Sequence, residues 1–153
     1  MLFLVVILSV QIGYKFRSIL AQENKDSQKI EAVINSFLKD AINRDIDSAM
    51  ESISVNYSEE ENNNIIDYSK FKSALEQFMS YYANKYVNQS ISGLVIRKID
   101  IQDNKANVEI EYDRNGFNID TLQEYQSKII RIVTLANEGG VWKITQWKQL
   151  QQK

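Results

Sequence analysis

Residues 106–113 read ANVEIEYD, a strict alternation of apolar and polar side chains. Successive side chains of a β-strand point to opposite faces, so this stretch is predicted to be a strand with one face in a core and one in water. The apolar face comprises Ala106, Val108, Ile110 and Tyr112. The polar face carries the acidic residues Glu109, Glu111 and Asp113, which are therefore expected to point away from the core.

The preceding stretch has the same two-residue period. Residues 90–102 are rich in β-branched residues, which favours a strand. One of its faces is expected to carry Val95, Ile99 and Ile101, and the other Lys98 and Asp100. The dipeptides Asp103–Asn104 and Asn115–Gly116 are the predicted turns on either side of the central strand.

Residues 125–136 predict a long strand that is apolar on both faces. The two faces carry Ile129, Val133 and Leu135 on one side and Ile130 and Ile132 on the other. A strand of this kind lies in the middle of a sheet or is covered at an interface. The sequence NEGG at 137–140 then predicts a hairpin turn into the last strand, residues 141–147, VWKITQW.

Before the strands the apolar spacing is helical. Over residues 30–42 apolar side chains recur at every third or fourth position, with Asp26 or Ser27 as the expected N-cap. Residues 45–53 predict a short second helix, and residues 55–57 an extended segment. The run EEENNN at 59–64 predicts a solvated loop, because it lacks the ligand spacing and the turn glycine of a calcium-binding loop.

Asp67 is the expected N-cap of a third helix, whose apolar side chains again recur at steps of three and four. They are Phe71, Leu75, Phe78, Met79, Tyr82 and Tyr86. Such an aromatic stripe is more typical of a core than of a cofactor site. Helices followed by long antiparallel strands predict an α+β fold, with N-terminal helices packed on a curved antiparallel sheet of about four strands.

The N-terminus predicts a separate hydrophobic segment. Residues 2–12, LFLVVILSVQI, have the length of a signal-peptide core and fall short of the roughly 20 residues that span a bilayer. Lys15 and Arg17 follow this run, which is the reverse of a normal signal peptide. We therefore expect residues 1–21 to be a signal peptide or a clipped membrane anchor. A linker at 22–29, one domain at 30–148 and a polar tail at 149–153 are expected to follow.

Composition excludes several classes of function. The chain of 153 residues has no cysteine and no histidine, so thiol catalysis, disulfides and the commonest metal ligands are excluded. Its 18 basic and 20 acidic residues lack the basic excess of a nucleic-acid binder. We predict no metal, no cofactor and no nucleic-acid partner. The absence of cysteine is compatible with a bacterial envelope protein, membrane-anchored or secreted.

Two motifs resemble those of nuclear transport factor 2-like domains. Residues 37–54, FLKDAINRDIDSAMESIS, are similar to the first helix and the turn into the second, and residues 135–147, LANEGGVWKITQW, are similar to the closing hairpin. The resemblance covers about residues 27–147 and implies a cone-shaped domain with a cavity between helices and sheet. It says little about activity, because this fold carries enzymes, ligand binders and assembly modules.

Two hypotheses for the function follow. The first is a non-catalytic module outside the cytoplasm that binds a protein partner or self-associates, with Ile130, Ile132 and Trp147 as its interface. The second is a small-molecule binder, or a lyase or isomerase, that uses the cavity. Its candidate ligand-binding residues are Tyr82, Tyr86, Tyr112 and Arg131. No catalytic residue is predicted. Arg131 shares a strand face with apolar residues, so it needs an anionic ligand or a cross-strand partner such as Glu109 or Glu111.

Overall fold

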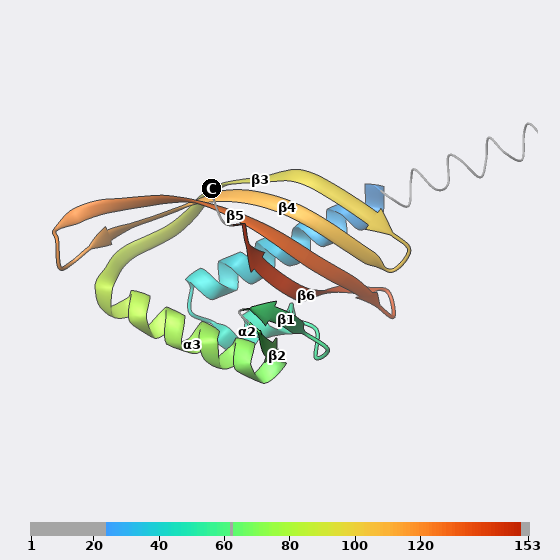
Figure 1. Cartoon of the computed structure of the whole chain (residues 1–153). Helices are drawn as coiled ribbons and strands as arrows, with labels where there is room; N and C mark the ends of the chain where they lie inside the picture. The colour runs from blue at the N-terminus through green and yellow to red at the C-terminus, as the bar shows by residue number, and fades with distance from the viewer. Residues whose placement is uncertain (1–23, 62, 151–153) are drawn as a thin grey trace, which may run out of the picture.

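The chain places its helices first and a four-stranded antiparallel sheet after them, which confirms the predicted α+β fold (Figure 1). The computed structural model describes residues 24–61 and 63–150, so the predicted leader at 1–21 lies outside the described residues. An N-terminal helix, helical over residues 24–42, is followed by α2 (Ile46–Glu51), strands β1 (Ser58–Glu61) and β2 (Asn64–Asp67), and α3 (Tyr68–Lys85). The main sheet consists of β3 (Tyr86–Gln102), β4 (Lys105–Asn118), β5 (Gln123–Glu138) and β6 (Val141–Gln149).

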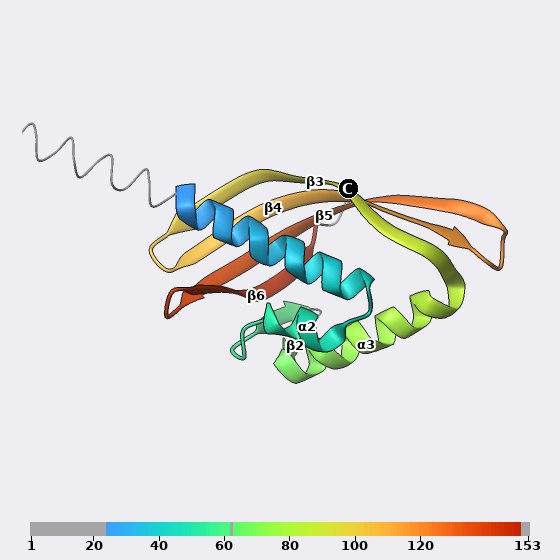
Figure 2. The same cartoon turned by 180° about the vertical axis from the view of Figure 1, so that it is seen from behind.

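The main sheet has the strand order β3-β4-β5-β6 and curves around the N-terminal helix (Figures 1 and 2). The inward face of β4 is as predicted: Ala106, Val108, Ile110 and Tyr112 are each at most 7% exposed. The hairpin between β5 and β6 is also confirmed. Gly139 and Gly140 have φ values of 65° and 96°, a backbone conformation that glycine adopts without strain. None of the helices in the described residues has the length and hydropathy of a membrane span.

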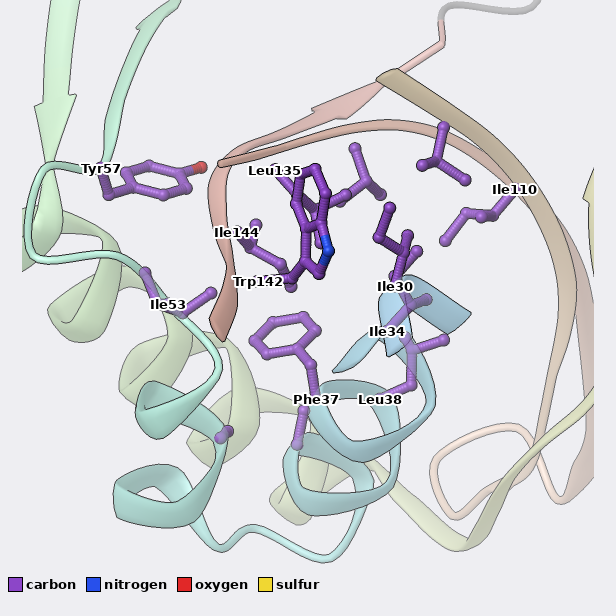
Figure 3. Close-up of a cluster of buried hydrophobic side chains, with 14 of the residues drawn as sticks. Ile30, Ile34, Phe37, Leu38, Ile53, Tyr57, Ile110, Leu135, Trp142 and Ile144 are labelled. Atoms are coloured by element: carbon purple, nitrogen blue, oxygen red, sulfur yellow. The ribbon is translucent and has the colours of Figure 1, made fainter. Parts of the chain in front are cut away.

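The hydrophobic core lies between the N-terminal helix and the concave face of the sheet. Figure 3 shows Trp142 projecting from β6 toward this helix, among Ile30, Phe37 and Leu135, and all four side chains are buried. The residues around α2 are tied to the same sheet, because the backbone N–H of Ser54 donates to the carbonyl of Ile144 at 2.8 Å. The stability of the N-terminal helix comes mainly from burial of its apolar side chains against the sheet, because short helices are only marginally stable by themselves.

The N-terminal helix starts earlier than its apolar stripe does. Residues 24–29, predicted as a linker, are helical, so neither Asp26 nor Ser27 is the N-cap. Asp26 has a role inside the helix: its carboxylate lies 3.4 Å from the indole Nε1 of Trp142 and forms an ion pair with Lys29 at 3.7 Å. Polar residues can extend a helix past its apolar stripe, and hydrophobic periodicity cannot detect that extension.

Residues 55–67 differ most from the predictions. Residues 55–56 form a turn, not an extended segment. The acidic run predicted as a loop contributes to a two-stranded hairpin, in which Glu59 pairs with Ile66. Asn63, with φ of 64°, belongs to the reversal between the strands. Backbone hydrogen bonds between the two strands form this hairpin. The sequence EEENNN has no apolar alternation that would predict a strand.

Two features of the main sheet also correct the predictions. In β3, Ile99 and Ile101 pack against the core as predicted, and Lys98 and Asp100 are exposed. A register shift between Ile96 and Lys98 changes the alternation before them, so Ile96 packs against the core and Val95 is 53% exposed. Asn115 and Gly116 do not form a turn, since both are paired with β5 inside a longer strand. The chain reverses after Asn118, whose side-chain oxygen accepts hydrogen bonds from the next N–H groups. The last strand also reaches Gln149, one residue into the predicted tail.

Candidate functional site

A cavity of about 390 Å³ lies between the helices and the main sheet. Its volume falls within the range of small-molecule sites in proteins. The helices contribute an apolar wall that includes Phe37, Leu38, Ala41, Phe71, Leu75 and Met79. The sheet contributes Tyr112, Arg114, Ile129, Arg131 and Trp147, and the β1–β2 hairpin contributes Glu59 and Glu61. An apolar cavity with a few polar groups on one side is the usual composition of a ligand site.

Tyr112 and Arg131, both predicted from the sequence, line this cavity from neighbouring strands. Burial raises the pKa of the Tyr112 hydroxyl, and the nearby guanidinium groups of Arg131 and Arg114 partly oppose that rise. The Nε of Arg131 is buried and has no hydrogen-bond partner among the described residues. A buried guanidinium nitrogen without an acceptor is unfavourable, so this position suits an acceptor supplied by a ligand.

The cross-strand partners considered for Arg131 are occupied elsewhere. Glu109 and Glu111 lie on the opposite face of the sheet, where both pair with Arg97 and Glu111 also pairs with Lys128. In register, Arg131 faces Ile110 instead. No ion pair to Arg131 is present in the described part of the chain. The two faces of β4 therefore separate these acids from the cavity.

Arg114 belongs to the same site, and the sequence prediction missed it. Its side chain is only 8% exposed, lies 3.7 Å from the ring centroid of Tyr82, and donates to the Oε1 of Gln89 at 2.9 Å. Stacking on an aromatic ring stabilises a guanidinium removed from water. A signal for this residue existed: Arg114 continues the alternation of residues 106–112, which the predicted turn at 115–116 cut short.

Glu59 is the second residue that the sequence reading missed. The hydroxyl of the buried Tyr57 donates to its Oε2 at 2.5 Å, and the backbone N–H of Trp147 lies 3.4 Å from the same oxygen. Burial and the hydrogen bond to Glu59 raise the pKa of Tyr57 well above its usual value. Glu59 is thus a carboxylate held in place at the cavity by two donors. No apolar pattern in its strand marks it as an inward-facing residue.

Tyr82 and Tyr86, also predicted as ligand-binding residues, are not among the residues that line the cavity. They form a row of aromatic rings with Phe78 and Tyr125, with centroid separations of 4.4 to 5.1 Å, in which Tyr82 and Tyr86 are stacked and the outer pairs are tilted. Tyr82 contributes to the site through the face that it presents to Arg114. Tyr86 ends α3 and begins β3, where it serves this aromatic packing.

The three residues predicted as an interface do not share a surface. Trp147 lines the cavity and packs on Phe37 with a centroid separation of 4.6 Å. Ile130 and Ile132 are paired with the polar-face residues Glu111 and Glu109 of β4, so they lie on the outer face. That face carries charged pairs beside the half-exposed Ile132. The register between β5 and β6 is irregular, so strand periodicity alone did not predict that Trp147 and the two isoleucines lie on opposite faces of the sheet.

Neither a protein-family model nor a curated protein matches the sequence. Solved structures do match the fold. A nuclear transport factor 2-like superfamily protein from Salmonella enterica serovar Typhimurium is 14% identical, with a TM-score of 0.65, and the match covers 85% of this chain and 94% of that one. A candidate scytalone dehydratase from Novosphingobium aromaticivorans is 12% identical, with a TM-score of 0.70 and coverage of 86% and 89%.

A candidate dehydratase from the nuclear transport factor 2-like family of Streptomyces avermitilis is 8% identical, with a TM-score of 0.66. The match covers 81% of this chain and 94% of that one. Structural similarity at identities this low establishes the fold and leaves the activity open. The strand order, the helix inside the curved sheet and the cavity between them agree with the resemblance of residues 37–54 and 135–147. The chain therefore has the nuclear transport factor 2-like fold.

Proposed function

We propose that this domain binds a small organic molecule in the cavity between its helices and its sheet. The observation that carries this proposal is the arrangement of polar groups on one side of an apolar cavity of about 390 Å³. Tyr112, Arg131 and Glu59 reach the cavity from three different elements, and the buried Nε of Arg131 has no acceptor among the described residues. Two of the solved structures with this fold are named as candidate dehydratases, which supports a ligand-binding use of the cavity.

Native mass spectrometry of the full chain, purified without denaturation, tests this proposal. We expect a bound mass that is released on denaturation or after incubation with competing small molecules. An Ala74→Trp variant adds bulk at a residue that lines the cavity, and it should lose the bound mass. Ala32→Trp is the matched control, because Ala32 is an exposed residue of the N-terminal helix outside the cavity lining. Equal retention of the bound mass by both variants would contradict binding in the cavity.

A lyase or isomerase activity is the second candidate, and the Tyr57–Glu59 pair favours it. A carboxylate fixed at the wall of an apolar cavity can act as a general base toward a bound carbon acid. NMR of α-proton exchange in a cyclic ketone dissolved in D2O measures this ability directly. We expect Glu59→Gln to abolish exchange above the buffer rate, while Glu60→Gln, in the same strand but outside the cavity lining, retains it.

The role in protein binding or assembly outside the cytoplasm stays a prediction from the sequence. Ile130 and Ile132 on the outer face of β5 are its candidate contact residues, now without Trp147. Light scattering of the full chain and of Ile132→Asp measures the contribution of this face. Self-association through the outer face predicts a smaller particle for the variant, and an unchanged particle size contradicts it.

A further inference from the structure

The cavity has an uneven charge distribution, and that distribution indicates the class of ligand. On the sheet side, the hydroxyl of Tyr112 lies near two guanidinium groups, those of Arg131 and Arg114. The opposite wall, contributed by the helices, is apolar. A ligand that fits both walls has a polar, acceptor-rich end and an apolar body.

The two acidic residues of the cavity come from a different element than Tyr112 and the two arginines. Both come from the β1–β2 hairpin, and Glu61 is exposed to solvent. Glu59 accepts from Tyr57 and lies near the backbone N–H of Trp147, and no ion pair joins it to either arginine in residues 24–61 and 63–150. The charged groups that act on the Tyr112 hydroxyl are both cationic.

The two arginines have different surroundings. Arg114 is held by stacking on Tyr82 and by the hydrogen bond to Gln89, so its position is fixed without a ligand. Arg131 has a buried Nε for which the described part of the chain supplies no acceptor. A guanidinium presents its N–H donors in a planar fork that matches the two oxygens of a carboxylate. A carboxylate beside Arg131 supplies the missing acceptor and also reaches the hydroxyl of Tyr112.

We propose that the ligand of this cavity is a carboxylic acid with an apolar body, whose carboxylate binds Arg131 and Tyr112 with Arg114 as a second cation. This proposal rests on the proposed small-molecule function and specifies its ligand class. The apolar body lies against the helical wall, which includes Phe71, Leu75 and Met79. Arg131 distinguishes the acid from an uncharged molecule of the same length, because a carboxylate adds a charge-assisted hydrogen bond to the guanidinium that an uncharged group does not supply.

The test is isothermal titration calorimetry of the full chain with three probes of equal length: octanoate, octanol and octylammonium. We expect octanoate to bind about 10- to 100-fold more tightly than octanol, the factor that a hydrogen bond between charged groups provides. Arg131→Met should remove most of this preference. Arg97→Met is the matched control, since Arg97 is an arginine on the opposite face of the sheet, and it should leave the preference unchanged.

The outcomes separate the ligand class from the general function. Equal affinity for octanoate and octanol overturns the carboxylate proposal and leaves small-molecule binding standing. Preference for octylammonium also overturns the carboxylate proposal, because it shows that the negative charges of Glu59 and Glu61 determine which ligand charge the cavity binds. Binding of none of the probes overturns the carboxylate proposal, and the native mass spectrometry above then decides the general function on its own. If Arg131→Met does not fold, the comparison of probes on the unmodified chain and on Tyr112→Phe still decides the ligand class.

Discussion

Replacing Arg131 with methionine is expected to stabilise the empty protein, although Arg131 is the proposed anchor for the ligand. The buried Nε of Arg131 lacks an acceptor within residues 24–61 and 63–150, and such a group costs about 1–3 kcal/mol. The guanidinium also stabilises the neighbouring Tyr112 hydroxyl, a contact worth about 0.5–1.5 kcal/mol that the variant loses. Methionine keeps most of the apolar contacts, because its side chain is flexible and fills irregular space. The net expectation is a gain of about 1 kcal/mol in the free energy of unfolding.

Urea denaturation followed by the fluorescence of Trp142 and Trp147 measures this change. A gain of about 1 kcal/mol corresponds to a rise of roughly 4 °C in Tm for a domain of this size. The slope of unfolding free energy against urea should stay the same, because the variant changes little buried surface. Arg97→Met is the control: Arg97 is 44% exposed, and loss of its surface ion pairs should cost about 0–1 kcal/mol.

A loss of more than about 1 kcal/mol in Arg131→Met would refute this reasoning. It would show that Arg131 has a structural partner whose contribution exceeds the cost of its unpaired Nε. The case for a ligand carboxylate at this position would then lose its main support. A gain in stability together with weaker octanoate binding is the result expected of a binding residue.

Three further predictions concern the fold around the site. Ile110→Ala should lower the free energy of unfolding by about 3 kcal/mol in urea denaturation, because Ile110 is fully buried, whereas Ile65→Ala, at 60% exposure, should change it by no more than about 0.5 kcal/mol. Asp67→Ala should cost about 1 kcal/mol, since the Asp67 carboxylate accepts from the Lys70 N–H at the start of α3, and Asp67→Ser should restore most of it. The raised pKa of Tyr57 stabilises the folded state below its unfolded pKa of about 10, and this contribution is lost as the pH rises further. Tyr57→Phe should therefore reduce the decline in stability above pH 10 by about 1.4 kcal/mol per pH unit, as measured by urea denaturation at a series of alkaline pH values.

The sequence predicted the structure correctly where the spacing of apolar residues indicated which face of a strand is buried. The alternation of residues 106–112 correctly predicted the inward face of β4, and with it Tyr112. The apolar face of β5 placed Arg131 on the inner side of the sheet in the same way. Asp67 was recognised as a helix cap because capping depends on a few neighbouring residues. These features depend on local periodicity or local hydrogen bonding.

The rest of the site required the tertiary structure. Glu59 becomes a cavity residue only because its hairpin packs near β6, where the hydroxyl of Tyr57 and the backbone of Trp147 approach its carboxylate. Arg114 could be placed in the cavity only once the end of β4 was known. Pairing with both neighbouring strands extends β4 to Asn118. Such contacts join residues distant in the sequence, so no spacing along the chain records them.

The sequence by itself determined the three helices, the four strands of the main sheet, the inward face of the central strand and the exclusion of thiol and histidine chemistry. Only the tertiary structure decided that Arg131 does not pair with Glu109 or Glu111, because both acids bind cations on the other face of the sheet. It also decided that Trp147 belongs to the cavity and not to an outer surface. The physical reason is that periodicity gives the direction of a side chain within its own strand, whereas its partners depend on register, bulges and packing between strands.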